Sequence, residues 1–205
     1  MKEFTLYMAD APSRATNVLW GLEECGADYD VVALSFGGSM KEPEYLAINP
    51  LGKVPALRHK GAVLTETAAV LTYLAEQFPA KNLIPAVGTP ERGQYYRWLC
   101  FALNLEYGAV DKWRQIENND QQRLAIGYGD FNVALDVLRD HLKDHSYIVG
   151  DRFSMLDLYY SGLLAWLIHG AKVIAVDPVF VEYMTRHMAR PAYAKSGEVQ
   201  ARYQA

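Results

Sequence analysis

One amphipathic helix between two strand-like segments constrains the fold of this chain more than any other feature. Residues 3–8 (EFTLYM) and 29–34 (YDVVAL) have the composition of β-strands. Between them, apolar residues recur with the period of an α-helix until Gly26 ends the pattern: Ala15, Val18, Leu19, Leu22 and Cys25. Because a helix between two such strands is a crossover connection, the strands should be parallel.

The next segment predicts a hairpin followed by a helix. Two short apolar runs, VPAL at 54–57 and AVLT at 62–65, flank RHKG, a turn that ends in Gly61. A helix from about Thr67 should then bury the apolar residues Val70, Leu71, Leu74 and Phe78. The order βαβ followed by ββα resembles the thioredoxin-like fold.

The chain after a proline-rich stretch at residues 79–90 is predicted to be helical. Thr89 and Pro90 match an N-cap and first helical residue, and the helix should run to about Gln115. A second apolar stripe predicts the next helix: Leu124, Tyr128, Phe131, Leu135, Leu138 and Leu142. Ser154 with Asp157 three residues later resembles a capping box.

The pattern therefore predicts two domains. An α/β thioredoxin-like domain should cover residues 1–80 and a linker residues 81–89. An all-α domain should cover residues 90–205, with shorter helices at 178–188 and in the tail beyond Pro191.

Charge and cysteine content exclude several classes of protein. A formal net charge of −4 and a pI near 5.7 provide no basic field for nucleic acid or an anionic membrane. Cys25 and Cys100 lack a CxxC or zinc-type spacing, which favours a reducing compartment. His141 and His145 have no third ligand in their pattern, so no metal is expected. With no signal peptide or membrane span predicted, we expect a soluble, cytoplasmic protein.

The loop between the first strand and the first helix carries the reactive group in thioredoxin-like folds. Here it is MADAPSRAT, residues 8–16, and it contains no cysteine, so dithiol–disulfide exchange has no nucleophile. Ser13 lies beside the positive end of the helix dipole. Its hydroxyl is either an ordinary N-cap or a hydrogen-bond donor that lowers the pKa of a bound thiol.

Three segments together resemble the cytosolic glutathione S-transferases over essentially the whole chain. They are NPLGKVPAL at 49–57, the pair Glu66–Thr67, and GDRFSMLDLYY at 150–160. Each is weak alone and specific in combination. The resemblance implies a homodimeric detoxification enzyme that uses glutathione as co-substrate and adds its sulfur to a small apolar electrophile.

The resemblance also implies roles for single residues. Pro55 is expected to follow a cis bond, so that Val54 offers its N–H and C=O to the cysteinyl part of glutathione. Glu66 would pair with the γ-glutamyl ammonium, and Thr67, at a helix N-terminus, would receive the carboxylate. Asn49 is expected to satisfy its own backbone in the Asn-Pro turn.

Lysines and aromatic residues complete the expected site. Lys53, and Lys41 from the preceding segment, are candidates for the glycine carboxylate. Tyr107 and Trp113, late in the long helix, are candidates for the electrophile pocket. Asp157 is expected to fold the C-terminal domain rather than to bind substrate.

The thiol-activating residue and the reaction remain open at this stage. APSRAT resembles the serine-type pattern and favours Ser13, with Tyr7, Thr16, Arg14 or a backbone N–H as alternatives. The same binding motifs serve glutathione-dependent isomerisation, dehalogenation and peroxide reduction. A non-catalytic glutathione-binding or protein-interaction module with this fold is the alternative from another functional class.

Overall fold

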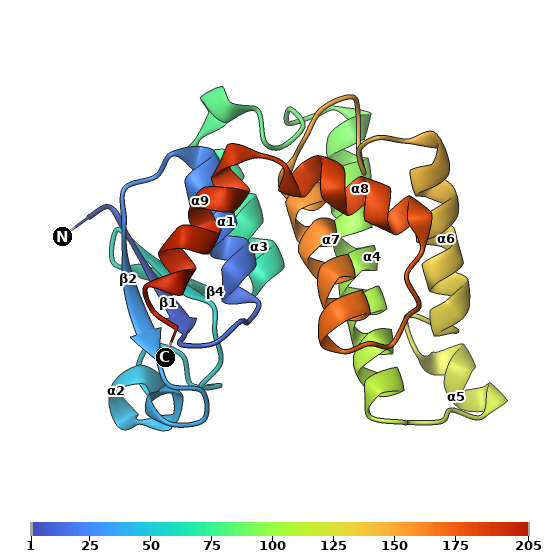
Figure 1. Cartoon of the computed structure of the whole chain (residues 1–205), viewed down its shortest axis with the longest axis horizontal. Coiled ribbons are helices and arrows are strands. Elements are labelled where there is room, and N and C mark those ends of the chain that lie inside the picture. Colours follow the sequence, from blue (N-terminus) through green and yellow to red (C-terminus); the bar gives the residue numbers. More distant parts are fainter. Residues whose placement is uncertain (1, 205) are drawn as a thin grey trace. The chain divides into compact units, whose positions relative to one another are not determined.

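The computed structural model describes residues 2–204, which form two compact units (Figure 1). Unit 1 contains the N-terminal residues up to Leu83 together with the C-terminal residues from Ala189, and unit 2 runs from Ile84 to Met188. The sequence prediction placed residues 90–205 in one helical domain. In the structure, the last helix packs with unit 1 instead.

Unit 1 is built on a four-stranded sheet in the order β2-β1-β3-β4. β1 and β2 are parallel, as the crossover requires, and β3 is antiparallel to both of its neighbours. The predicted βαβ unit and hairpin are therefore confirmed. Lys60 and Gly61 both have positive φ, 48° and 82°, as a two-residue type I′ turn requires. The strands are β1 (Phe4–Ala9), β2 (Tyr29–Leu34), β3 (Ala56–His59) and β4 (Ala62–Thr65).

The two faces of the sheet bury alternate residues of β1. Phe4 stacks on His59 of β3, with ring centroids 4.1 Å apart, and lies 5.9 Å from Phe78 at the end of α3 (Thr67–Gln77). Tyr7 belongs to a cluster on the opposite face, with Tyr45 and its neighbours from the segment of η1 (Ser39–Lys41) and α2 (Pro43–Leu46). The sheet thus separates two apolar layers.

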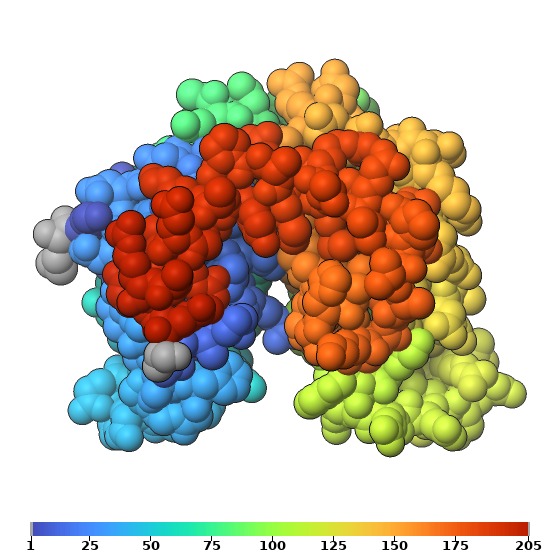
Figure 2. All heavy atoms as spheres, in the orientation of Figure 1, coloured from blue at the N-terminus to red at the C-terminus, as the bar shows by residue number. Residues whose placement is uncertain are grey.

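The C-terminal helix α9 (Pro191–Ala201) packs on α1 (Ala15–Cys25), and Figure 2 shows its atoms lying over those of α1. Both carboxylate oxygens of Glu24 accept hydrogen bonds from Arg190, at 2.7 and 2.8 Å. Trp20 Nε1 donates to the same carboxylate at 3.0 Å. The rings of Trp20 and Tyr193 form a T-shaped pair with their centroids 4.8 Å apart. These contacts assign α9 to unit 1.

Unit 2 is helical, and Thr89 caps α4 by accepting from the N–H of Arg92 at 3.3 Å, as predicted. The single helix predicted from Leu124 is wrong, because Gly129 has a φ of 62° and Asp130 caps a new helix by accepting two backbone N–H groups. The helices of unit 2 are α4 (Pro90–Trp113), α5 (Asp120–Ala125), α6 (Phe131–Asp144), α7 (Met155–Ala165), a wider π-type turn (Trp166–Gly170) and α8 (Pro178–Met188). Unit 1 ends its N-terminal part with a short 3-10 turn, η2 (Pro79–Lys81). None of the helices described is long and apolar enough to cross a membrane.

The predicted capping box at the start of α7 is confirmed. Asp157 is fully buried and accepts hydrogen bonds from the N–H and Oγ of Ser154, the N–H of Ile148 and the hydroxyl of Tyr183, at 2.7–2.9 Å. Burial raises the pKa of Asp157 to about 6, although these hydrogen bonds lower it. Asp157 therefore joins α7 to α8 and to the preceding loop.

Candidate functional site

The sheet register brings three predicted site segments to one end of unit 1. Ala56 of β3 lies opposite Tyr7 of β1 and opposite Thr65 of β4. β1 therefore ends, β3 begins and β4 ends at the same end of the sheet. The loop before α1, the proline segment before β3 and the pair that opens α3 thus meet there.

The backbone of Val54 offers both a donor and an acceptor at this end of the sheet. The Val54–Pro55 bond is cis, as the resemblance implied, and the Val54 side chain packs on the core cluster around Tyr7 and Tyr45. Within residues 2–204, neither the N–H nor the C=O of Val54 has a hydrogen-bond partner. A free donor and a free acceptor on one residue are what a peptide-like ligand pairs with.

Thr67 and Glu66 form the start of α3. Thr67 is only 6% exposed, and its Oγ1 is a buried polar atom that lacks a hydrogen-bond partner in the part of the chain described. Glu66 has φ 64° and ψ 111°, a backbone conformation that costs a non-glycine residue about 1–3 kcal/mol. A buried hydroxyl at a helix N-terminus suits a carboxylate, and the exposed carboxylate of Glu66 suits an ammonium group.

Ser13 lies at the start of α1. Its Oγ accepts a hydrogen bond from the N–H of Ala15 at 3.3 Å, and its C=O accepts from the N–H of Thr16 at 3.0 Å. The hydroxyl proton remains available to donate, because no acceptor for it is found among residues 2–204. The first turn of α1 carries no acidic side chain that would repel a thiolate. The capping role and the thiolate-donor role are therefore compatible.

The alternatives to Ser13 have different surroundings. Tyr7 is 6% exposed and packs in the core against Tyr45, with ring centroids 5.8 Å apart. Arg58 lies over the Tyr7 ring at 5.7 Å. Thr16 is half-buried in the first turn of α1. The burial of Tyr7 supports Ser13, and the choice stays a prediction.

The two candidate lysines are used differently. Lys41 Nζ donates to the carbonyl oxygens of Leu51 and Gly52, at 3.2 and 2.7 Å. Gly52 has a φ of 56°, and a Cβ at this position would lie 2.7 Å from Lys41 Nζ. Lys53 is exposed and has no carboxylate partner among the described residues. Lys53 is therefore the better placed of the two for a ligand carboxylate.

Two residues that the sequence analysis did not assign to the site hold the same loop. Tyr45 and Asn49 both donate to the carbonyl of Lys53, at 2.5 and 2.8 Å. Asn49 also accepts from the N–H of Leu51 at 3.2 Å, as expected for an Asn-Pro turn. Lys41, Tyr45 and Asn49 follow one another at intervals of four residues, but this spacing does not show that their side chains reach carbonyl groups of the loop.

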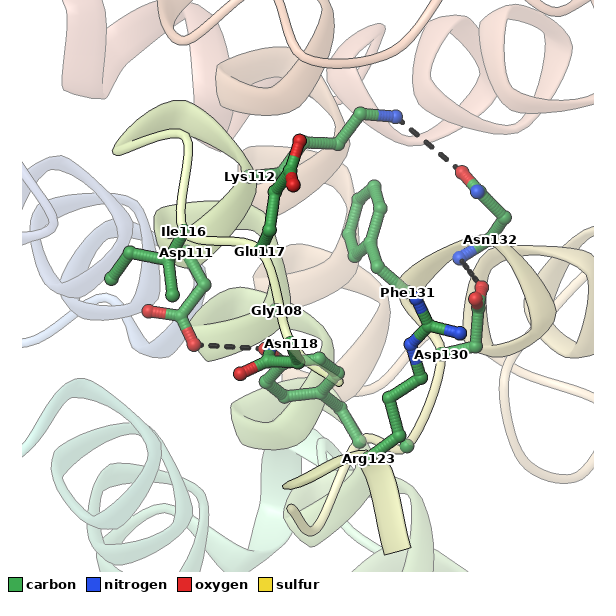
Figure 3. Close-up of a pocket in the computed structure, with 12 residues that line it drawn as sticks. Gly108, Asp111, Lys112, Ile116, Glu117, Asn118, Arg123, Asp130, Phe131 and Asn132 are labelled. Carbon is green, nitrogen blue, oxygen red and sulfur yellow. Dashed lines mark hydrogen bonds between the residues drawn. The ribbon is translucent and has the colours of Figure 1, made fainter. Parts of the chain in front are cut away.

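In unit 2, Tyr107 and Trp113 lie late in α4 and are 67% and 62% exposed. A hollow near the end of α4 has a largely polar lining, which does not include either residue (Figure 3). Tyr128 donates to Asp111 at 2.8 Å and accepts from Asn118 at 3.1 Å in its wall. The charged residues that line the hollow are Asp111, Lys112, Glu117, Arg123 and Asp130. This hollow does not suit an apolar electrophile, and the role of Tyr107 and Trp113 stays a prediction.

The histidine pair at the C-terminal end of α6 lies within hydrogen-bond distance of backbone carbonyl groups. His141 Nε2 lies 3.0 Å from the carbonyl of Ile148, and His145 Nδ1 lies 2.8 Å from the carbonyl of His141. Among the residues described, His, Cys, Asp and Glu form no group of three or more that could hold a metal ion.

Family models match both units. Residues 2–76 match the model described as glutathione S-transferase, N-terminal domain, and residues 121–186 match the model described as glutathione S-transferase, C-terminal domain. The first match contains Ser13, Lys41, Lys53, Val54, Glu66 and Thr67.

Individual relatives and solved structures agree with the family models. The chain is 28% identical over 190 residues to glutathione S-transferase GstA of Escherichia coli O157:H7, which covers 91% of this chain and 90% of that protein. It is 30% identical over 149 residues to glutathione S-transferase hmp2 of Hypomyces subiculosus, covering 67% and 70%. A sphingomonad glutathione S-transferase complexed with glutathione has a TM-score of 0.76 and 27% identity over 96% of this chain and 98% of that chain. The chain belongs to the glutathione S-transferase family.

Proposed function

We propose that the chain is a glutathione transferase that binds glutathione at the end of the sheet in unit 1 and transfers its sulfur to an apolar electrophile. The observation that carries the proposal is the buried, unpartnered Oγ1 of Thr67 at the N-terminus of α3. The names of the relatives and the glutathione in a similar solved structure support the same activity.

Complementary charges orient the tripeptide. The γ-glutamyl carboxylate accepts from Thr67 Oγ1 and the free N–H groups that open α3, and the ammonium pairs with Glu66. The cysteinyl part pairs with the N–H and C=O of Val54 as an added strand. The glycine carboxylate reaches Lys53, whose ammonium is exposed.

Thiol activation is assigned to Ser13. Its hydroxyl donates to the sulfur of bound glutathione while Oγ keeps the hydrogen bond from Ala15. This charge-assisted bond and the positive end of α1 stabilise the thiolate and lower the thiol pKa from about 8.5. A shift of about two units needs roughly 2.7 kcal/mol, which these two effects together can supply. The thiol proton is released to solvent, and the thiolate forms the S–C bond. In a substitution the leaving group departs with its bonding electron pair, and in an addition the resulting carbanion takes a proton from solvent.

A titration of bound glutathione tests this mechanism. The thiolate absorbance is measured against pH for the wild type and for Ser13→Ala, with Thr16→Ala as the matched control from the same turn. We expect a lowered pKa in the wild type and in Thr16→Ala, and a pKa near that of free glutathione in Ser13→Ala. An unshifted wild-type pKa would favour the non-catalytic binding module. An unchanged Ser13→Ala pKa would move the role to Tyr7 or Thr16.

The reaction subtype depends on the second substrate. Exposed Tyr107 and Trp113 are proposed to contact an apolar electrophile. Purified protein is assayed with glutathione and an aryl halide, an α,β-unsaturated carbonyl, a cis-diacid, an alkyl halide and an organic peroxide. Turnover of the first two classes supports conjugation. Turnover of only the diacid, alkyl halide or peroxide would indicate the isomerase, dehalogenase or peroxidase alternative.

We also propose a homodimer that serves detoxification in the cytoplasm, with the N-terminal domain of one subunit against the helical domain of the other. Exposed apolar side chains on both units support an interface, including Phe36 and Leu51 of unit 1 and Val133 of unit 2. Two free cysteines, Cys25 and Cys100, support a reducing compartment. Light scattering of the purified chain and fractionation of cells test these two points, and a monomeric mass would overturn the first.

A further inference from the structure

The loop that leads into β3 is held by three side chains spaced four residues apart. Lys41 Nζ donates to the carbonyl oxygens of residues 51 and 52, at 3.2 and 2.7 Å. Tyr45 Oη and Asn49 Nδ2 both donate to the carbonyl oxygen of Lys53, at 2.5 and 2.8 Å. We call Lys41, Tyr45 and Asn49 the carbonyl clamp. Three successive carbonyl groups are thus occupied immediately before the residue whose backbone is free.

The bonds to Lys53 determine the direction of the next N–H. A carbonyl oxygen has two lone pairs, and Tyr45 and Asn49 supply a donor for each. The Lys53–Val54 peptide is not among the cis bonds found in the described residues, so its C=O and N–H point in opposite directions. Fixing the Lys53 carbonyl therefore directs the Val54 N–H away from the clamp.

Two of the three clamp side chains are buried in the core of unit 1, whereas Lys41 is exposed. Tyr45 is 3% exposed and Asn49 is 4% exposed. Burial is the largest cause that raises the pKa of Tyr45, so its phenol keeps the proton that it donates. A Cβ at Gly52 would lie 2.7 Å from both Lys41 Nζ and the carbonyl of Met40, so only glycine permits this approach.

We infer that Tyr45 and Asn49, assisted by Lys41, are positioning residues that hold the Val54 N–H ready for the cysteinyl carbonyl of glutathione. The inference rests on the proposed function and adds residues that do not touch the ligand. It assigns Lys41 to the loop rather than to the glycine carboxylate. Because the loop is ordered before the ligand arrives, binding loses less conformational entropy.

Three ligands separate this role from a general loss of structure. Glutathione has every group, its glycyl amide lacks the glycine carboxylate, and γ-glutamylcysteamine lacks both the glycine and the cysteinyl carbonyl. Dissociation constants are measured by calorimetry, with competition for the weakest ligand. Tyr45→Phe removes one hydroxyl, and Tyr73→Phe is the matched control, because its hydroxyl bonds to His59 at 2.7 Å in the same unit.

We expect Tyr45→Phe to weaken glutathione and its glycyl amide by the same factor, about fivefold. It should leave γ-glutamylcysteamine unchanged, because that ligand has no cysteinyl carbonyl for Val54. Tyr73→Phe should change none of the three. Equal loss for all three ligands, or no loss for glutathione, would overturn the inference.

Lysine variants distinguish the clamp from a carboxylate contact. Lys53→Met should weaken glutathione and leave its glycyl amide unaffected. Lys41→Met should weaken both ligands by the same factor. Loss confined to glutathione in Lys41→Met would return Lys41 to the glycine carboxylate and overturn its place in the clamp.

A measurement without ligand separates failure of the clamp from failure of the proposed function. The ¹⁵N order parameter of the Val54 amide reports its motion on the ps–ns timescale. We expect a rigid value in the wild type and in Tyr73→Phe, and a lower value in Tyr45→Phe. An unchanged value in Tyr45→Phe, with normal wild-type binding, would overturn the clamp alone. If the order parameter falls in Tyr45→Phe as expected but the wild-type protein binds no glutathione, the clamp stands, and the proposed ligand is overturned together with the role of Val54 in binding it.

Discussion

Buried polar groups are satisfied differently at the candidate site of unit 1 and in the core of unit 2. Asp157 in unit 2 is fully buried, yet four hydrogen-bond donors reach its carboxylate. Thr67 in unit 1 is nearly as buried, yet its Oγ1 has no partner among residues 2–204. Because an unmade buried hydrogen bond costs about 1–3 kcal/mol, the difference supports the proposal that a ligand supplies the missing partner of Thr67.

Position, together with the missing partner, supports the proposed ligand site at Thr67. Ser161 Oγ is also buried without a partner in the described chain, but it lies inside α7, which runs from Met155 to Ala165. Thr67 is the first residue of α3, where the backbone N–H groups lack partners within the helix. It follows β4 at the end of the sheet where Ala56 pairs with Thr65, and Val54 precedes β3 at the same end.

The largest effect is expected where the network is complete. Asp157→Ala leaves four buried donors without their acceptor and should lower the free energy of unfolding by roughly 3–5 kcal/mol. Urea denaturation measures this loss. Asp140→Ala is the control on a neighbouring helix, because Asp140 is exposed and pairs only at the surface with Lys143, so we expect no measurable change. A loss below 1 kcal/mol for Asp157→Ala would show that the network does not hold unit 2 together.

Unit 1 also contains a buried polar group with a full set of partners, the Glu24 carboxylate. This group tests whether a missing partner is a feature of the candidate site or of unit 1 as a whole. The Glu24 side chain is 5% exposed and accepts from Trp20 and twice from Arg190. Glu24→Gln should cost about 2–3 kcal/mol, discounted because Arg190 is partly exposed. Urea denaturation followed by far-ultraviolet circular dichroism measures it, with Glu198→Gln on the exposed side of α9 as control. An unchanged midpoint would mean that α9 contributes little to unit 1.

The elements of the fold that depend on the local period of apolar residues could be predicted from the sequence. The strand and helix periods gave the βαβ unit, the hairpin and most helix boundaries, since each depends on residues close in sequence. The docking of α9 could not be found this way, because Glu24 and Arg190 are 166 residues apart. The break before α6 was missed because an apolar stripe continues through Gly129, whose positive φ ends it.

The site was predictable where a motif specifies the backbone. The cis bond before Pro55 followed from the family resemblance, and the start of α3 at Thr67 followed from the apolar pattern of the helix. The role of Lys41 could not be read from its charge, because that role depends on carbonyl groups ten and eleven residues later. Tyr45 was likewise missed, since nothing in the sequence shows that its hydroxyl meets Lys53.

The pH dependence of stability tests how Asp157 is held. Its pKa is raised to about 6 from an ordinary value of 3.8, so the folded chain binds this proton more tightly than the unfolded chain. The stabilising contribution is therefore complete below pH 3.8 and is lost as the pH rises through about 6. The advantage of the wild type over Asp157→Asn in unfolding free energy should be larger by about 2 kcal/mol near pH 4.5 than near pH 7.5.

Denaturation of both proteins across this range measures the difference. His187 Nε2 lies 3.9 Å from Asp157 Oδ1, so the comparison is repeated in a His187→Gln background. An advantage that is independent of pH in both backgrounds would mean that the four hydrogen bonds keep Asp157 ionised throughout, and that their effect exceeds that of burial.

The smallest and most discriminating effect is expected at Thr67. Thr67→Val keeps the shape of the side chain and removes the unpartnered hydroxyl, so the free energy of unfolding should stay equal or rise slightly. Affinity for glutathione should fall about tenfold, as loss of one hydrogen bond to a charged group predicts. Ser161→Ala removes the other unpartnered hydroxyl and should raise stability by up to about 1 kcal/mol without changing affinity. Calorimetric titration and urea denaturation of both variants give the two quantities for each. If both variants lose affinity alike, or if neither does, an unpartnered hydroxyl at a helix start would carry no more information about ligands than one inside a helix.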